Sequence, residues 1–200
     1  MNLFHFLTLE GGNNLNTIVT SKEAILEASR ELIRTEGWNS INIRSVAKAC
    51  NISVGTIYNY FQNKTDLITA TIESIWQDIF HMPEEDLSFR NFLDSINWAF
   101  DKIQEGDQKY PGFFTSHSIS FVDSEKKHGQ KKMEESLQHI QDGFYQVLIH
   151  DTQVDQTIFT ETFTHRKFVS MVFSLLLSSL IAKNYDRQDI VHMIQLFLYR

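Results

Sequence analysis

The sequence contains few of the residues that interrupt helices or cross-link a chain. Among 200 residues there are two prolines, eight glycines and one cysteine, Cys50. A single cysteine excludes a disulfide framework and a cysteine-based zinc site, and it fits a reducing, cytoplasmic location. Scarce proline and glycine favour long helices, because these residues are the usual punctuation between elements. We expect Cys50 to be a small buried packing residue rather than a reactive thiol.

Motifs of several enzyme and membrane classes are also missing. There is no glycine-rich phosphate loop, no His-Glu-x-x-His and no i, i+4 pair among the eight histidines, so we expect no enzyme activity, no cofactor and no metal site. The apolar run Phe168–Ala182 is too short to span a bilayer and holds four serines, so no membrane partner is expected. Residues 1–19 carry no lysine or arginine, which predicts a flexible extension rather than a signal peptide.

Apolar residues recur at helical spacing along most of the chain, and no stretch alternates as a strand does. We expect a first helix with Thr20 as its cap and Gly37 as its left-handed end. Further helices are predicted after caps at Ser88 and Asp186. The fold class predicted is all-α: a three-helix helix-turn-helix DNA-binding domain (20–67) followed by a larger helical ligand-binding and dimerisation domain (68–200).

The boundaries of the second domain are predicted from its few breaks. Gly106 and Pro111 are expected to bound one connection, and a short aromatic-rich element follows at Phe113–Phe121. A long helix is expected to start at Ser124, and the most apolar helix is expected over Phe163–Ala182.

Two helix starts of the same design stand at the centre of the predicted first domain. Asn42 and Ser53 are each a good cap, and each has an isoleucine before it and an apolar residue at the fourth helical position, the spacing of a hydrophobic staple. The second of these helices, predicted over Val54–Phe61, is the candidate for the major groove. Asn63 then caps a helix that begins at Lys64 and continues to about Phe80.

Charge is distributed unevenly between the two predicted domains. The whole chain carries a formal net charge of −7, which taken alone argues against nucleic-acid binding. Lys22–Asp66 holds six basic and five acidic residues, a local balance of +1, so the excess of acid lies elsewhere. With so small a positive balance, one head should bind DNA weakly, and dimerisation is expected to be required.

The segment Lys22–Leu67 resembles the TetR-type bacterial transcription regulators. The resemblance rests on Glu36-Gly37-Trp38, Ile43-Arg44-Ser45-Val46-Ala47 and, above all, Ser53-Val54-Gly55-Thr56-Ile57-Tyr58-Asn59-Tyr60-Phe61 followed by Asn63-Lys64. It covers roughly a quarter of the chain. It implies a homodimer, usually a repressor, that a small-molecule effector entering the carboxy-terminal domain releases from a two-fold operator on double-stranded DNA.

Candidate DNA contacts follow from the position of each residue in this motif. The amino-terminal residues of the second helix meet base edges, and tyrosine hydroxyls and lysines contact phosphates. Arg44 is able to pair bidentately with guanine, and the Thr56 methyl suits a thymine methyl. Tyr58 and Tyr60 could instead be core aromatics, and Lys48 is a weaker candidate. The predicted contacts are Arg44, Ser53, Val54, Gly55, Thr56, Tyr58, Asn59, Tyr60 and Lys64.

Two further sites are predicted in the second domain. Large apolar side chains and one histidine could line an effector pocket, although each could simply be core: Trp98, Phe113, Phe114, His117, Phe121 and Phe144. A stripe of serines and the last helix are predicted to form the dimer interface, although the stripe could instead pack within the chain. The predicted interface residues are Ser170, Ser174, Ser178, Ile194 and Phe197.

Two other classes of function remain open. A protein of this kind could have exchanged DNA for a protein partner and act as a coactivator, although Arg44, Tyr60 and Lys64 argue against that. A helical enzyme or carrier is the other class, for which no catalytic constellation is present.

Overall fold

The structure, a computed structural model, describes residues 20–81, 89–114 and 127–199. Within these ranges the chain is helical and contains no strand, which confirms the all-α prediction. None of the helices in the described ranges is both long enough and apolar enough to cross a membrane. The helices are α1 (Lys22–Glu36), α2 (Ile43–Ala49), α3 (Val54–Tyr58), α4 (Lys64–Ile79), α5 (Phe92–Lys109), α7 (Lys127–His150), α8 (His165–Ile181) and α9 (Gln188–Leu198).

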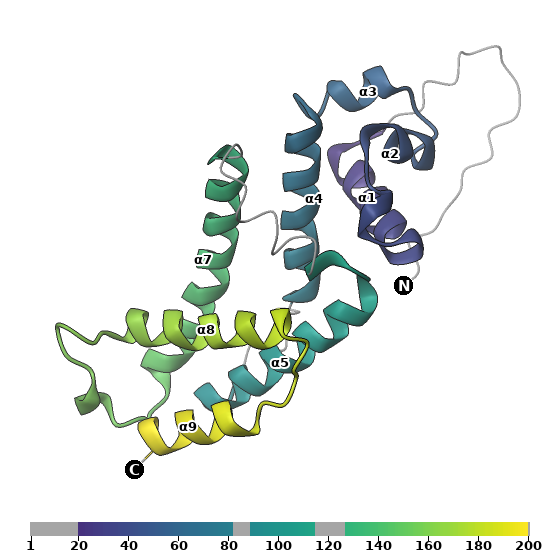
Figure 1. Cartoon of the computed structure of the whole chain (residues 1–200). Helices are drawn as coiled ribbons and strands as arrows, with labels where there is room; N and C mark the ends of the chain where they lie inside the picture. The colour runs from purple at the N-terminus through teal and green to yellow at the C-terminus, as the bar shows by residue number, and fades with distance from the viewer. Residues whose placement is uncertain (1–19, 82–88, 115–126, 200) are drawn as a thin grey trace, which may run out of the picture.

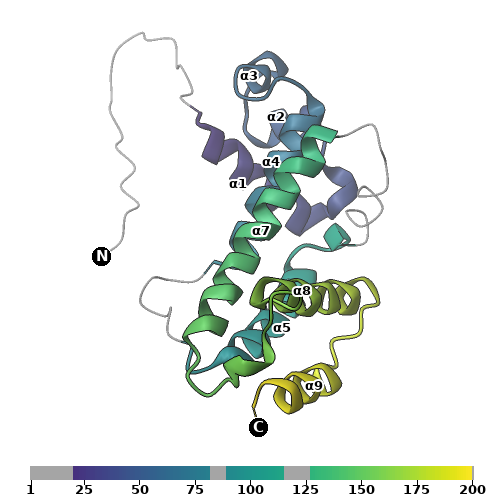
Figure 2. The same cartoon turned by 90° about the vertical axis from the view of Figure 1, so that its left-hand side faces the viewer.

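The first three helices form a small head at one end of the molecule, with α3 at its tip (Figures 1 and 2). The caps expected at Asn42, Ser53 and Asn63 are all present, and each side chain accepts a hydrogen bond from a backbone N–H in the first turn of its helix. Asn42 and Ser45 form a reciprocal capping box. Because a neighbouring side chain satisfies one or two of the free N–H groups at each start, the helices begin where the sequence predicts.

Two predictions about the head need correction. Ser21, not Thr20, caps α1, and its hydroxyl accepts from the Ala24 N–H at 3.1 Å. The recognition helix α3 is shorter than the predicted Val54–Phe61, because the backbone N–H groups of both Tyr60 and Phe61 donate to the Ile57 carbonyl and tighten the last turn. This turn directs Phe61 into the core, where only 3% of it is exposed.

The remaining helices form a larger body below the head. Helix α4 leads down from the head and packs against α7 and α5, while α8 packs on α7 and α5 (Figures 1 and 2). Helix α9 lies against α5 at the end of the molecule farthest from α3. Helices α3 and α9 therefore lie at opposite ends of the molecule.

Several helix boundaries in the body differ from the prediction. Helix α5 begins at Phe92 rather than after Ser88, which lies outside the described residues. Asn91 caps it, and the Asp151 carboxylate accepts the Phe92 N–H at 2.8 Å. The helix then continues through Gly106 to Lys109 instead of ending at the glycine. Both differences arise from contacts with distant segments, since Gly106 packs against Ile79 of α4.

The ends of α7, α8 and α9 are also shifted from their predicted positions. Helix α7 starts at Lys127, and Ser124 is outside the described residues. Thr164 caps α8, which therefore excludes Phe163 and ends one residue before Ala182. At α9 the Asp186 carboxylate accepts the Gln188 N–H at 3.0 Å, although Arg187 occupies the cap position.

The head is fastened to the body by contacts around the end of α1. Gly37 ends α1 with φ +80° and ψ 170°, a conformation that glycine adopts readily, and the following Trp38 N–H donates to the Pro111 carbonyl at 3.1 Å. Tyr110 is fully buried, and its hydroxyl donates to Asp78 of α4 at 2.7 Å. Burial alone would raise the pKa of Asp78, but the hydrogen bonds from Lys109 and Tyr110 outweigh it and lower that pKa.

Candidate nucleic-acid interface

Helix α3 is held on the head by a few buried residues and leaves most of its surface exposed. Ile57 is fully buried and Phe61 nearly so, which confirms their assignment to the core. Three large apolar or aromatic side chains of this segment remain exposed: Val54 at 39%, Tyr58 at 50% and Tyr60 at 39%. Exposed aromatic and β-branched residues on so short an element are typical of a surface that contacts a partner.

The cations of the head fall into two groups. On α1, Arg30 and Arg34 form ion pairs with Glu27, and Arg34 also pairs with Glu31. Arg44, Lys48 and Lys64, on α2 and at the start of α4, are exposed, and none of them has an ion pair among the described residues. The ion-paired acidic residues of the head, Glu27 and Glu31, thus lie on α1, and the three cations nearest α3 are left without an ion pair among the described residues. The head also holds three acidic residues with no ion pair in the described ranges: Glu23, Glu36 and Asp66.

The other predicted DNA contacts are also accessible, with one difference. Ser53, Val54, Gly55, Tyr58 and Asn59 are exposed, as is Tyr60. Thr56 is half-buried, and its hydroxyl lies 2.9 Å from the Ser53 hydroxyl, which caps α3. The structure thus places the predicted set on one short segment and its two flanking helices, while the roles of individual residues at DNA stay predictions.

Tyr60 has a contact that sequence reasoning missed. Its hydroxyl donates to the backbone carbonyl of Thr20, just before α1. To donate to a phosphate, this hydroxyl would have to give up its hydrogen bond to Thr20. No motif could have indicated the contact, because it joins residues 40 positions apart.

Cys50 is half-buried at the end of α2, and burial raises the pKa of its thiol. A raised thiol pKa lowers the fraction of reactive thiolate. Cys50 packs against the core as the sequence predicts, but it is partly rather than fully buried.

A row of aromatic ring contacts runs from the head into the body. Trp38 lies edge-on to Phe113, with ring centroids 5.5 Å apart, and Phe113 contacts Trp76 of α4 at 6.0 Å. Trp76 stacks on Phe80 at 5.8 Å, and Phe80 contacts Trp98 of α5 at 5.7 Å. Each pair lies within the range in which aromatic rings attract one another.

The row ends at a pocket of about 430 Å³ between α5, α7 and the end of α4. Two of the predicted pocket residues, Trp98 and Phe144, line it. Phe113 and Phe114 do not line this pocket and are buried in the ring cluster around Trp76, so their assignment to an effector pocket stays a prediction. His117 and Phe121 lie outside the described residues. We call this space the α5–α7 pocket; its apolar lining is Phe80, Phe89, Trp98, Ile140, Phe144 and Val147.

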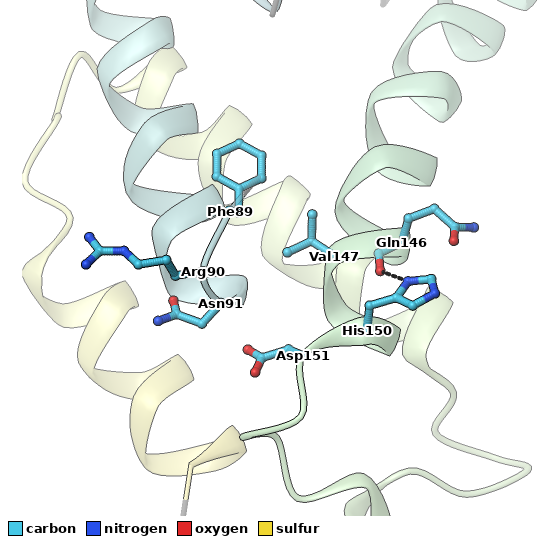
Figure 3. A pocket seen from close by; sticks show the side chains of 7 residues that line it. All are labelled: Phe89, Arg90, Asn91, Gln146, Val147, His150 and Asp151. Atoms are coloured by element: carbon cyan, nitrogen blue, oxygen red, sulfur yellow. Dashed lines mark hydrogen bonds between the residues drawn. The ribbon is translucent and has the colours of Figure 1, made fainter. Parts of the chain in front are cut away.

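A second, smaller pocket of about 250 Å³ adjoins it at the start of α5 and shares Phe89, Gln146 and Val147 with it. Figure 3 shows Phe89 and Val147 on two neighbouring segments beside this space, with Asp151 below them. Asp151 is buried and already accepts hydrogen bonds from the Phe92 N–H, the Gln153 N–H and the Tyr199 hydroxyl. It therefore joins α5, α7 and the end of α9, and it serves the fold.

The predicted dimer residues divide between the surface and the core. Ser170, Ser174 and Ser178 are exposed on α8, and Phe197 is 36% exposed on α9. Ile194 is fully buried within the chain, so its assignment to a subunit interface is wrong. Five further large apolar side chains of these two helices are exposed: Met171, Leu175, Ile181, Met193 and Leu196.

Comparison with known proteins agrees with this arrangement. Residues 25–71 match the family described as "Bacterial regulatory proteins, tetR family". The HTH-type transcriptional regulator UidR of Escherichia coli K12 is 38% identical over 52 residues, which are 26% of this chain and 26% of UidR. The match thus spans about a quarter of the length of that curated relative.

Solved structures extend the likeness to the fold of the body. A crystal structure of a putative TetR-family transcriptional regulator from Rhodococcus sp. has a TM-score of 0.63 at 14% identity, covering 88% of this chain and 97% of that one. The regulator FadR from Bacillus subtilis, solved with stearoyl-CoA, has a TM-score of 0.60 at 20% identity, covering 84% and 91%.

The exposed α3, its capped supports and the unpaired cations around it have the arrangement of a helix-turn-helix head. The match over residues 25–71 identifies this head more narrowly, as the helix-turn-helix segment of the tetR family of bacterial regulatory proteins.

Proposed function

We propose that the chain is a homodimeric, non-enzymatic transcriptional regulator that binds a two-fold operator in the cytoplasm and acts as a repressor released by a small molecule. The observation that carries the DNA-binding part is the position of the unpaired cations. Arg44, Lys48 and Lys64 surround α3 without acidic partners among the described residues, whereas Arg30 and Arg34 are neutralised. Counterion release on contact with phosphates supplies most non-specific affinity, and it needs cations that are not already paired.

The proposed dimer is supported by the apolar surface of the body. Apart from the three side chains near α3, all the exposed large hydrophobic residues in the described ranges lie on α8 and α9. A surface of this kind is unfavourable in water, and a two-fold interface would bury it against its own copy. The small Ser170, Ser174 and Ser178 would let the two α8 helices approach closely.

Release by an effector is supported by the path from the α5–α7 pocket to the head. Phe80 follows the last residue of α4 and lines the pocket, while Lys64 is the first residue of the same helix and lies beside α3. A ligand that moved α4 would change the separation of two recognition helices on a rigid duplex. FadR, a regulator of the same fold, was solved in complex with stearoyl-CoA, which supports a ligand for this fold.

A gel-shift titration with the DNA upstream of the chain's own gene tests the proposal. We expect a discrete complex whose affinity falls steeply with salt, because several phosphate contacts release counterions. A randomised fragment of equal length is the control for specificity. If no complex forms at low salt, the regulator function is excluded, and pull-down of a protein partner becomes the test of the coactivator alternative.

A further inference from the structure

The lining of the α5–α7 pocket is mostly aromatic and aliphatic. Four aromatic rings surround it, from Phe80, Phe89, Trp98 and Phe144. Phe89 and Phe80 both contact Trp98, with ring centroids 5.5 Å and 5.7 Å away and planes inclined by about 60°. Rings held at such angles present faces and edges to an inserted molecule, and aromatic ligands pack well in both arrangements.

The lining also carries no fixed charge among the described residues. Its polar members are His139 and Gln146, both on α7. An amide such as that of Gln146 donates and accepts hydrogen bonds without a charge. The charged group of α7 nearest in sequence, Asp142, forms an ion pair with Arg166 of α8 instead. Transfer of an unpaired ionic ligand into such a space would cost much of its hydration free energy without compensation.

The adjoining pocket does not change this balance. Its carboxylate, Asp151, is occupied by three donors and cannot attract a cation without losing them. Its Arg90 pairs with Asp94, and 89% of the Arg90 side chain is exposed. In Figure 3 the Arg90 side chain points away from Phe89 and Val147. An anionic group would therefore find no buried partner there.

Gly106 and Gly143, two glycines inside helices of the body, differ in the space around them, and the difference bears on the pocket. A Cβ at Gly106 of α5 would lie 2.8 Å from the Ile79 Cδ1 atom, so the Ile79 side chain would have to move to admit it. A Cβ at Gly143 of α7 would meet no atom of the described residues within 4 Å, so packing does not require it. Glycine destabilises a helix interior relative to alanine. Gly143 lines the α5–α7 pocket, where a missing side chain leaves room for something else.

We propose that the α5–α7 pocket binds a neutral aromatic molecule, which lies against Gly143 between the four rings and forms a hydrogen bond with Gln146. Only the identification of this molecule as the effector rests on the function proposed above. Binding itself is measured without DNA, so a failed gel shift and an unoccupied pocket are separate results.

The test is a fluorescence titration of the full chain with N-phenyl-1-naphthylamine, a neutral aromatic probe that brightens in apolar surroundings. The matched anionic probe is 8-anilino-1-naphthalenesulfonate, which has the same skeleton with a sulfonate. We expect saturable binding of the neutral probe, and at least about tenfold weaker binding of the sulfonate because its charge would be buried unpaired. A naphthylmethyl-trimethylammonium competitor should not displace the neutral probe.

Gly143→Leu supplies the site-specific arm, with Gln138→Leu as its control on the exposed surface of α7. We expect Gly143→Leu to weaken the neutral probe at least about tenfold by filling the space, and Gln138→Leu to change it less than about twofold. The thermal midpoint of Gly143→Leu should not fall, since a leucine there meets open space and favours helix.

Several results would overturn the proposal. Equal binding of the neutral probe to both leucine variants would place it elsewhere, for example on the apolar surface of α8 and α9. Equal binding of the sulfonate, or displacement by the ammonium compound, would assign the pocket to an anionic or a cationic ligand. A lower thermal midpoint for Gly143→Leu would show that the space is filled by the protein itself.

Discussion

The head and the body of this chain are stabilised by different kinds of contact. In the head, Asn42, Ser53 and Asn63 each cap the helix that follows, within three residues. In the body, Asp151 joins segments 59 and 48 residues away, and Gly106 admits a close approach between α4 and α5. Local contacts determine where α3 begins. Contacts between distant residues determine the shape of the body, which would set the distance between the two heads of a dimer.

This difference separates two requirements of a DNA reader. In the proposed function the head would supply the groups that touch bases and phosphates, and the body would supply the distance between two copies. A variant in the body should then disturb DNA binding without altering sequence preference, and a variant in the head should alter preference without altering assembly. The predictions below test this separation.

The largest effect is expected at the apolar surface of the body, about as far from α3 as the fold allows. Leu196 is 66% exposed on α9, and Leu196→Glu would place a carboxylate in the proposed interface. We expect a monomer by light scattering, and a loss of about 100-fold or more in operator affinity because the second head no longer binds from the same complex. Ser174→Trp on α8 should have the same effect through steric clash.

The matched control is Gln188→Glu, which adds the same charge at an exposed position in the first turn of α9. It should remain dimeric and bind the operator normally. A dimer that persists in both Leu196→Glu and Ser174→Trp would show that this surface serves another partner.

In the head, Arg44→Ala and Lys64→Ala should differ in kind. If Arg44 pairs bidentately with guanine, its loss costs about 1–3 kcal/mol on the operator and relaxes preference at one base pair. Lys64→Ala should weaken binding to every sequence and lower the salt slope by about one phosphate contact. Both variants should remain dimeric, because both residues are exposed on the head.

Fluorescence anisotropy on the operator and on random DNA, each at several salt concentrations, separates the two residues. Equal losses for Arg44→Ala on both DNAs would assign Arg44 to phosphate binding. Lys48→Ala provides a third cation from the same unpaired group for comparison.

The sequence predicts the head better than the body for a physical reason. The caps at Asn42, Ser53 and Asn63 and the positive φ at Gly37 depend on neighbours within a few residues. Where two adjacent residues could each cap, as at Thr20 and Ser21, local pattern alone chose wrongly. The hydrogen bond from the Tyr60 hydroxyl to the Thr20 carbonyl could not be predicted from the sequence, because it depends on how the segment after α3 packs near the start of α1.

In the body the decisive contacts are distant in sequence. Asn91 rather than Ser88 starts α5, because the Asp151 carboxylate accepts the Phe92 N–H. Ile194 shares an apolar helix with Leu196, yet one is fully buried and the other mostly exposed. Helical periodicity identifies the apolar side of α9, but it does not distinguish the surface that packs inward from one that could meet a second chain.

The smallest expected effects compare the two glycines of the body by their stability. Gly106→Ala gains about 1 kcal/mol of helix propensity, but its Cβ would lie 2.8 Å from Ile79 Cδ1 and 2.9 Å from Cγ1. Overpacking of this kind costs about 1–3 kcal/mol, so we expect a net destabilisation of up to about 2 kcal/mol. Gly143→Ala meets open space and should stabilise the chain by about 0.5–1 kcal/mol.

Urea unfolding of the parent chain and both alanine variants measures whether each substitution raises or lowers the free energy of unfolding. Opposite signs would show that α4 and α5 are packed tightly at Gly106, whereas α7 at Gly143 keeps a glycine that the fold does not need. Equal stabilisation by both substitutions would mean that Ile79 moves aside at little cost. The body would then be soft where α4 crosses α5, and a ligand in the α5–α7 pocket could move Phe80 without moving the start of α4 at Lys64.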